Sequence, residues 1–200
     1  MDLKDFSDII EKLSSYTWRQ ENLFFIKDKS GKVVKYTPND VQKKLIEQRH
    51  RRTLVPKARQ HGVSTAVALH FLNTVLGTPH QRCAIIAHRE SDSLKIFDQK
   101  VKFPLEHIPE PFRPFLPQVK KLTNNYLELD NGSSISADTM VRSDTLTHLH
   151  ISELGKMSAW YPIKAEEVRT GALPAAERGE IIIESTMEGA TGLMRSEEHT

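Results

Sequence analysis

The chain has 200 residues, 38% of them hydrophobic and 27% charged, an ordinary composition for a soluble globular protein with one sizeable core. A net charge of +2 is too small to indicate nucleic-acid binding by itself, and the single cysteine, Cys83, excludes an internal disulfide and is expected to be a buried thiol. The sequence has no run of about 18 apolar residues and its acidic N-terminus does not resemble a signal peptide, so we expect neither a membrane span nor secretion.

The first fifty residues predict two helices separated by a hairpin. Apolar residues recur at helical spacing over residues 2–14, which predicts an amphipathic helix. Residues 23–37 are typical of a β-hairpin with its turn at 27–32. A second helix is predicted to start after the capping residue Thr37 and to run to about His50.

The middle of the chain alternates predicted strands and helices. Each predicted strand is a short apolar or β-branched run, and each is followed by a segment with helical features. In chain order we predict a strand at 53–55, a helix at 64–77 with Gly77 as C-cap, a strand at 82–88 and a helix at 91–103. Half of the ten prolines fall within 104–117, so this segment is predicted to be a connector without regular helix or central strand.

The remainder predicts a hairpin at 126–137 with its turn at Asn131-Gly132, and two buried strands at 146–152 and 180–186. Helical material is expected between these two strands, around 160–170. The alternation of strands and helices predicts an α/β fold with a mostly parallel sheet and helices on its faces.

The segment "KARQHGVST", Lys57 to Thr65, resembles a phosphate-binding loop whose lysine is displaced. In the pattern G-x-x-x-x-G-K-[ST], Gly62 fills the second glycine position and Ser64 the hydroxyl position. Val63 stands where the lysine is expected, and Lys57 stands where the first glycine is expected. The loop follows a predicted strand and opens a predicted helix, which is the context such a loop requires.

Lys57 can still contact a bound phosphate from the start of the loop. A lysine side chain spans roughly 6 Å, and its ammonium acts as a point charge without strict angular demands. Arg59 adds a second cation, and Ser64 is placed to reach Mg²⁺. The alternative is that Lys57, Arg59 and His61 are solvated loop residues.

The segment "LTHLHISELGKM" predicts a carboxylate at the end of a buried strand. Ligands of open parallel sheets bind outside the carboxyl ends of the strands, so Glu153 is a candidate for orienting or deprotonating an attacking water. Ser152 stands where an Asp is usual and is predicted to reach Mg²⁺ through a water. The alternative is that Glu153 simply caps the following helix.

Two further features are less specific. The strand at 180–186 ends in Ser185-Thr186, with Gly189 just beyond, where small polar residues could sense a γ-phosphate. His148 and His150 alternate along one strand and share a face. With one cysteine and no nearby third ligand expected, we predict that they are structural histidines and not a zinc site.

Together, these pieces resemble the ATPase domain of the large terminase subunit, the motor that packages DNA into tailed-phage and herpesvirus capsids. The loop resembles the "RQxGxST" form of that family, in Arg59, Gln60, Gly62, Ser64 and Thr65. Some terminases carry the Walker A lysine at the start of the loop, as Lys57 would be. "HISE", from His150 to Glu153, resembles the "HxSE" form of Walker B.

Three other segments extend the resemblance to residues 35–193. "YTPNDVQKKL" resembles the adenine-recognition element and places Gln42 where a glutamine reads the adenine edge. "ESTMEG" resembles the coupling motif, although Met187-Glu188 replaces the usual Pro-Asn. Arg142 falls where relatives often carry an arginine before Walker B, as a possible phosphate sensor.

The resemblance implies a P-loop NTPase fold (RecA/ASCE-like), with ATP and Mg²⁺ as cofactors. It implies Glu153, Lys57 and Arg59 as catalytic residues, Ser64 and Ser152 as metal ligands, and Ser185, Thr186 and Gly189 as coupling residues. The nucleotide contacts it implies are Gln42, Lys57, Arg59, Gln60, His61, Gly62, Val63, Ser64 and Thr65. Its implied partners are double-stranded DNA, the portal protein, the small terminase subunit and further copies of the chain in a ring, in the host cytoplasm.

For domain organisation we predict a helix and hairpin appendage at 1–35 and a P-loop ATPase domain at 36–194, truncated before its last elements and before the nuclease domain of the family. Residues 195–200 resemble the translation of a sequencing adapter and are expected to be non-native. Two alternatives stay open: a helicase-like translocase of another system, and a non-catalytic nucleotide-binding assembly module. The basic segments 49–52 and 119–122 are candidate DNA contacts, but such charge runs are usually solvated faces.

Overall fold

The computed structural model describes residues 3–57, 61–140 and 145–186. Its centre is a seven-stranded sheet with the strand order β3-β9-β8-β4-β7-β6-β5. The strands are β3 (Arg52–Lys57), β4 (Arg82–Ala87), β5 (Val119–Leu122), β6 (Tyr126–Leu129), β7 (Ser134–Asp138), β8 (His148–Ser152) and β9 (Glu180–Thr186). The pairings from β3 through β7 are parallel, while β6 pairs antiparallel with β7 and β5. The predicted α/β fold with a mostly parallel sheet is therefore confirmed.

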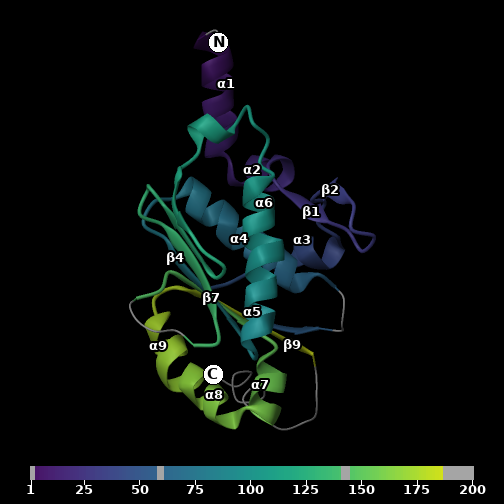
Figure 1. Cartoon of the computed structure of the whole chain (residues 1–200), viewed down its shortest axis with the longest axis vertical. Coiled ribbons are helices and arrows are strands. Elements are labelled where there is room, and N and C mark those ends of the chain that lie inside the picture. Colours follow the sequence, from purple (N-terminus) through teal and green to yellow (C-terminus); the bar gives the residue numbers. More distant parts are fainter. Residues whose placement is uncertain (1–2, 58–60, 141–144, 187–200) are drawn as a thin grey trace.

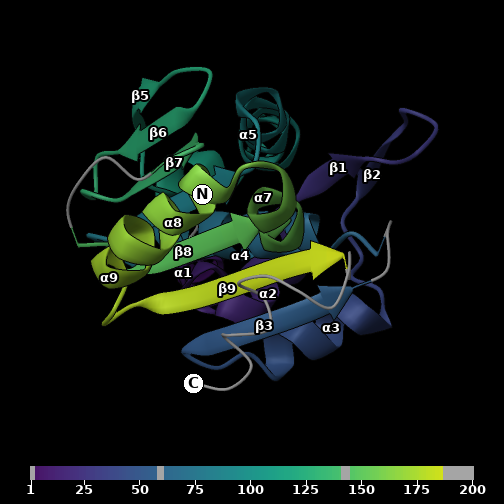
Figure 2. The same ribbon diagram turned by 90° about the horizontal axis from the view of Figure 1, so that it is seen from below.

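Helices cover both faces of the sheet (Figures 1 and 2). Side chains of β4 alternate between two cores, since Cys83 and Ile85 join one cluster and Ala84 and Ile86 the other. The first core packs against α4 (Val63–Gly77), α5 (Glu90–Phe97) and the π-helical turn η1 (Asp98–Lys102). The second packs against α7 (Leu154–Trp160), α8 (Pro162–Glu167), the π-helical turn η3 (Val168–Ala172) and α9 (Leu173–Ala175).

The N-terminal part packs on the first core. It consists of α1 (Leu3–Ser14), α2 (Tyr16–Asn22), and the antiparallel hairpin of β1 (Phe25–Lys27) and β2 (Val33–Lys35). The predicted helix and hairpin are confirmed, and α2 is an additional helix. Leu23 and Phe24, between α2 and β1, are fully buried in the same cluster as the sheet residues.

Two predicted helix ends are corrected. Helix α3 (Asp40–Glu47) is capped by Asn39 and not by Thr37. Asn39 and Gln42 form a reciprocal capping box, which satisfies two backbone N–H groups and so fixes the start of the helix. Gly77 is the last residue of α4 and not its cap, because the extended Thr78 ends the helix.

The proline-rich segment differs from its prediction at both ends. Helix α6 (Phe103–Glu106) contains Pro104 and continues from η1. Hydrogen bonding is already irregular there, since the Phe103 N–H donates to the carbonyl of Asp98 in a π-type turn, and proline is tolerated near such a helix start. A short 3₁₀ turn, η2 (Arg113–Phe115), follows, and the unpredicted β5 then forms one edge of the sheet.

The opposite edge strand, β3, contains Pro56, which an edge strand accommodates because one side of its backbone needs no partner. Cys83 is buried, as expected, and is a free thiol. In the part of the chain that the structure describes, no helix has both the length and the apolar character needed to span a bilayer.

Candidate active site

The candidate site lies where three parallel strands end. Lys57 is the last residue of β3, Ser152 of β8 and Thr186 of β9. The sheet register pairs Lys57 with Thr186 and Ser152 with Glu184, so these side chains emerge at one edge. Helix α4 begins at the same end of the strands, and the first turn of a helix presents backbone N–H groups that suit an anion.

Lys57 reaches the centre of this site. Its Nζ lies 2.7 Å from Oε2 of Glu184 and 3.5 Å from Oε1 of Glu153. Only 11% of its side chain is exposed. The alternative that Lys57 is a solvated loop residue is therefore wrong.

Gly62 shapes the turn that leads into α4. It adopts the left-handed conformation with φ of 67°, and an added Cβ would lie 2.5 Å from Nε2 of Gln42. Gln42 is buried, donates from Nε2 to the Gly62 carbonyl at 2.8 Å and accepts from the Asn39 N–H at 3.0 Å. The position therefore favours glycine twice, by conformation and by space, and Gln42 ties α3 to the loop.

Glu184 is a central residue of the site that the sequence analysis missed. It is fully buried, and its Oε1 accepts hydrogen bonds from Ser64 Oγ and, at 3.0 Å, from Ser152 Oγ. Nε2 of His150 lies 3.2 Å from the same oxygen. Burial by itself would raise the pKa of Glu184, but the interactions with His150 and Lys57 outweigh it and hold the pKa far below its usual range.

A signal for Glu184 was present in the sequence. It is a carboxylate within the otherwise apolar run "EIIIEST", and an acidic residue is almost never fully buried without partners. The partners come from β3, β8 and α4, all remote in sequence, so the pattern could mark the residue but not its role.

Glu153 occupies a strained backbone position. Its φ of 60° and ψ of 45° are left-handed, which is uncommon for a residue other than glycine and is often found at functional sites. It precedes α7, but its side chain makes no capping hydrogen bond. It accepts instead from Thr186 Oγ1 at 3.0 Å and lies 3.5 Å from the ammonium groups of Lys57 and Lys156. Glu153 is therefore the N-cap residue of α7 by its backbone, whose carbonyl accepts from the Met157 N–H at 3.0 Å, while its carboxylate is directed to the candidate site and does not cap the helix.

The pKa of Glu153 lies below its usual range. Burial opposes this shift, whereas the hydrogen bonds from Thr186 and the charge of Lys57 produce it. Glu153 is therefore ionised at neutral pH and available as a hydrogen-bond acceptor.

Comparisons with known proteins give results at the level of structure. Neither a family model nor a curated protein matches the amino-acid sequence. The large terminase ATPase domain of Thermus phage P74-26 aligns with a TM-score of 0.57 and 19% identity, over 78% of this chain and 67% of that one. A mutant of that domain gives a TM-score of 0.58 and 18% identity, over 80% and 69%. The HK97 bacteriophage large terminase gives 0.68 and 14% identity, over 92% of this chain.

The chain has the fold of a phage large terminase ATPase domain. It spans 39% of the length of the HK97 large terminase. At identities of 14–19% the likeness establishes the fold, and the chemistry has to be argued from the residues of this chain.

In this terminase fold, the predicted coupling residues connect β9 to α7. Ser185 Oγ accepts from the Gly155 N–H at 2.9 Å. An added Cβ on Gly155 would lie 2.7 Å from that oxygen, so the helix approaches the strand closely only because this residue is glycine. Thr186 binds Glu153 through its hydroxyl, at 3.0 Å, and its N–H, at 3.3 Å.

The donor set of the site suits Mg²⁺. Ser64 Oγ, Ser152 Oγ and the Glu184 carboxylate converge on one point, and a hard cation prefers oxygen ligands of this kind. Mg²⁺ usually binds only one or two protein oxygens directly and keeps several of its waters. These three groups can supply the protein oxygens and orient the waters.

The other predicted residues are distributed as follows. Val63 is buried in the core, Thr65 lies in the first turn of α4, and His61 is exposed at the loop. Lys100, from η1, is a further cation that the sequence analysis missed. Burial lowers the pKa of Lys100, the charge of Glu184 acts in the opposite sense, and the charge of Lys57 acts in the same sense as burial. Arg59, Gln60, Arg142 and Gly189 lie outside the described residues.

The two strand histidines have different surroundings. His150 belongs to the candidate site through Glu184. His148 lies at the other end of β8, where His70 and Glu180 accompany it. The expectation that no third ligand lies near these histidines is therefore wrong for His148.

Proposed function

We propose that the chain is the ATPase motor domain of a viral DNA-packaging terminase large subunit. The observation that supports this most is the position of Lys57, which reaches Glu153 and Glu184 beside the start of α4. A lysine delivered from the end of β3 makes up for Val63 at the usual lysine position. The combination of cation, hydroxyl, helix N-terminus and ionised carboxylate is what ATP hydrolysis requires.

In this proposal the phosphates lie against the first turn of α4, with Gly62 allowing the backbone to approach them. Lys57 exchanges its carboxylate partners for phosphate oxygens, and Arg59 is a second phosphate contact. Gln42 reads the adenine edge from its place beside the loop, and its amide exchanges the hydrogen bonds to Asn39 and Gly62 for this contact. Glu153 accepts a hydrogen bond from the attacking water and orients it toward the γ-phosphate.

Ser64 would hold Mg²⁺, with Ser152 and Glu184 in direct or water-mediated contact. The ion would neutralise charge that develops on the phosphate oxygens. Glu184 would then serve two purposes, as a partner of Lys57 without nucleotide and as a magnesium-shell carboxylate with it.

Coupling would pass through Thr186 and Ser185. Thr186 holds the Glu153 carboxylate, and Ser185 holds the start of α7 through Gly155. A movement of Glu153 on hydrolysis is therefore transmitted to β9 and α7. We propose that such movements drive double-stranded DNA into a procapsid, in a ring of identical subunits that contacts the portal protein and the small terminase subunit in the host cytoplasm.

The catalytic proposal is tested by Glu153→Gln. Glutamine keeps the size of the side chain but removes the negative charge that orients the water, so kcat for ATP hydrolysis should fall by about 10²–10⁴-fold with ATP affinity largely retained. Glu166→Gln changes an exposed carboxylate on α8 and should leave hydrolysis unchanged.

Equal hydrolysis by wild type and Glu153→Gln would support the alternative of a non-catalytic nucleotide-binding module. Strand unwinding without portal binding would instead support a helicase-like translocase.

A further inference from the structure

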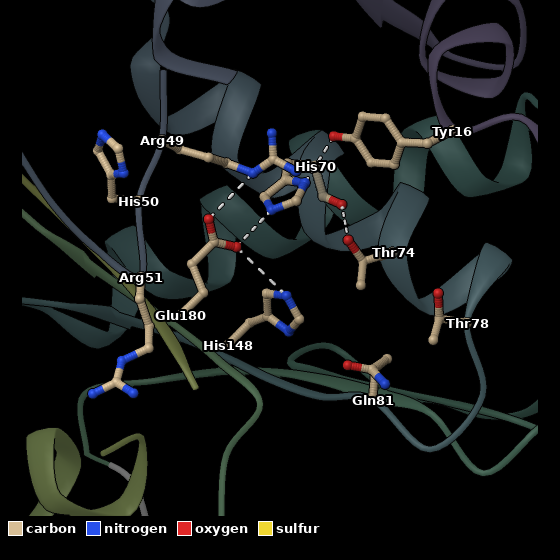
Figure 3. A pocket seen from close by; sticks show the side chains of 10 residues that line it. All are labelled: Tyr16, Arg49, His50, Arg51, His70, Thr74, Thr78, Gln81, His148 and Glu180. Atoms are coloured by element: carbon tan, nitrogen blue, oxygen red, sulfur yellow. Dashed lines mark hydrogen bonds and ion pairs between the residues drawn. The ribbon is translucent and has the colours of Figure 1, made fainter. Parts of the chain in front are cut away.

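A second polar cluster lies where strands β8 and β9 begin, at the end opposite to the candidate active site. His148 and Glu180 are the first residues of β8 and β9, and His70 lies in the middle of α4. The three side chains point toward one another at the wall of a cavity of about 730 Å³ (Figure 3). Among the described residues, these three form a group whose histidine nitrogens and carboxylate oxygen are close enough to one another to share a metal ion.

The distances fit a shared metal ion. Oε2 of Glu180 lies 2.8 Å from Nε2 of His70 and 3.5 Å from Nε2 of His148. The three ligand atoms all lie within 4.8 Å of one another. Ligands at about 2.0–2.2 Å from a tetrahedral zinc ion lie roughly 3.3–3.5 Å apart, so small side-chain movements would admit the ion.

Each candidate ligand is held by a second polar group. Nδ1 of His70 lies 2.7 Å from the Tyr16 hydroxyl, and Nδ1 of His148 lies 2.9 Å from the Thr147 hydroxyl. Both rings therefore have Nε2 directed at Glu180 (Figure 3). Arg49 Nε lies 3.2 Å from Oε1 of Glu180, the oxygen that faces away from the histidines. Metal-binding histidines commonly have their other ring nitrogen fixed in this way.

We propose that His70, His148 and Glu180 bind a divalent transition-metal ion of the zinc type. Two imidazoles and one carboxylate suit Zn²⁺ and disfavour Mg²⁺ and Ca²⁺, which prefer oxygen ligands alone. The cavity leaves room for a water or an anionic group at the fourth position. The ion would fix the middle of α4 to the starts of β8 and β9, the strands whose other ends carry the candidate active site.

The protonation states agree with this assignment. Burial lowers the pKa of His70 and lowers that of His148 to about 4. Burial acts against ionisation of Glu180, but His70 and Arg49 hold its pKa below the usual range. At neutral pH the imidazoles are thus neutral and the carboxylate is ionised, which is the state that binds a metal without first losing a proton.

The test is binding of Zn²⁺ and Co²⁺ to the 200-residue chain with Mg²⁺ in large excess, so that the oxygen-rich site does not compete. We expect one equivalent of zinc to be retained on dialysis, and Co²⁺ to give the visible absorption of four-coordinate cobalt. Glu180→Gln, which preserves side-chain shape, and His148→Ala should each weaken binding by at least about 100-fold. His107→Ala, at an exposed histidine beyond α6, should leave binding unchanged.

Failure of the wild-type chain to retain zinc would overturn the proposal and leave a hydrogen-bonded polar cluster. Equal retention by wild type and Glu180→Gln would overturn it too, because the ion would then be bound elsewhere. Circular dichroism of each variant separates loss of a ligand from loss of the fold. Both readouts measure metal binding alone, so either result leaves the test of ATP hydrolysis by Glu153→Gln to be decided separately.

Discussion

Lys57 contacts two carboxylates, and bound phosphates would have to take their place. Its ion pair with the fully buried Glu184 leaves little solvent to screen the charges. Removing one partner of such a pair typically costs about 3–5 kcal/mol, because the other charge stays buried and uncompensated. A triphosphate with its magnesium ion can compensate both residues at once, with the phosphates pairing Lys57 and the ion pairing Glu184.

Acid should destabilise the protein through His148. Burial beside His70 lowers its pKa from 6.5 to about 4, with Glu180 acting in the opposite sense and Arg49 in the same sense. The unfolded chain therefore binds a proton more readily, and stability is lost as the pH falls from about 6.5 toward 4, by roughly 3 kcal/mol. Urea unfolding at these two pH values should show this loss.

The variant His148→Asn should reduce the pH dependence between 4 and 6.5. An unchanged slope would mean that His148 is not the group responsible.

Glu184 acts in a lower pH window than His148. Its depressed pKa contributes stability that is present above the usual carboxyl range and is lost as the pH falls below about 4.5.

At the scale of elements, the close approach of α7 to β9 carries the proposed coupling. Gly155→Ala would place a methyl group 2.7 Å from Ser185 Oγ and 3.3 Å from the Thr186 carbonyl. We expect a loss of about 1–3 kcal/mol in unfolding free energy, measured by urea denaturation, with slower ATP hydrolysis because Glu153 is displaced.

Gly171→Ala in η3 is the matched control, since an added Cβ there meets no atom within 4 Å. This change should be neutral or slightly stabilising. Similar stability and activity for the two variants would show that the contact between α7 and β9 is not tight.

Helix α4 links the two polar sites of the molecule. It starts at the candidate active site with Ser64, and its middle residue, His70, contacts Glu180 at the opposite end of β9. The sheet makes the same connection through β9, which begins at Glu180 and ends at Thr186. A metal ion bound at the start of β8 and β9 would therefore bind the same elements that position the residues of the candidate active site.

Most of the sheet could be predicted from the sequence. Strands β4, β8 and β9 are buried on both faces, so their near-continuous apolar runs identify them. Helix α6 could not be predicted, because Pro104 opposes helix unless an irregular turn precedes it. The loop pattern marked Lys57 as a displaced lysine, and the end of β3 delivers it to the site.

The side-chain partnerships were less predictable. Glu184 gathers its contacts from three other elements, and His148 finds His70 and Glu180 only through the parallel register and the packing of α4. Sequence spacing specifies neighbours along one element but not contacts between elements. Gln42 is a similar case, since the capping box that holds it was visible only once Asn39 proved to be the cap.

The central claim is that Lys57 is the working lysine of the nucleotide site, and the most direct measurement is Mg-ATP affinity of the chain beside Lys57→Ala. Loss of a direct phosphate contact should cost on the order of 1.5–3 kcal/mol, more than tenfold in affinity, with the variant still folded. Lys95→Ala, an exposed lysine on α5, is the control and should bind as the wild type does. Equal affinity of the wild type and Lys57→Ala would contradict the claim and remove Lys57 from the site.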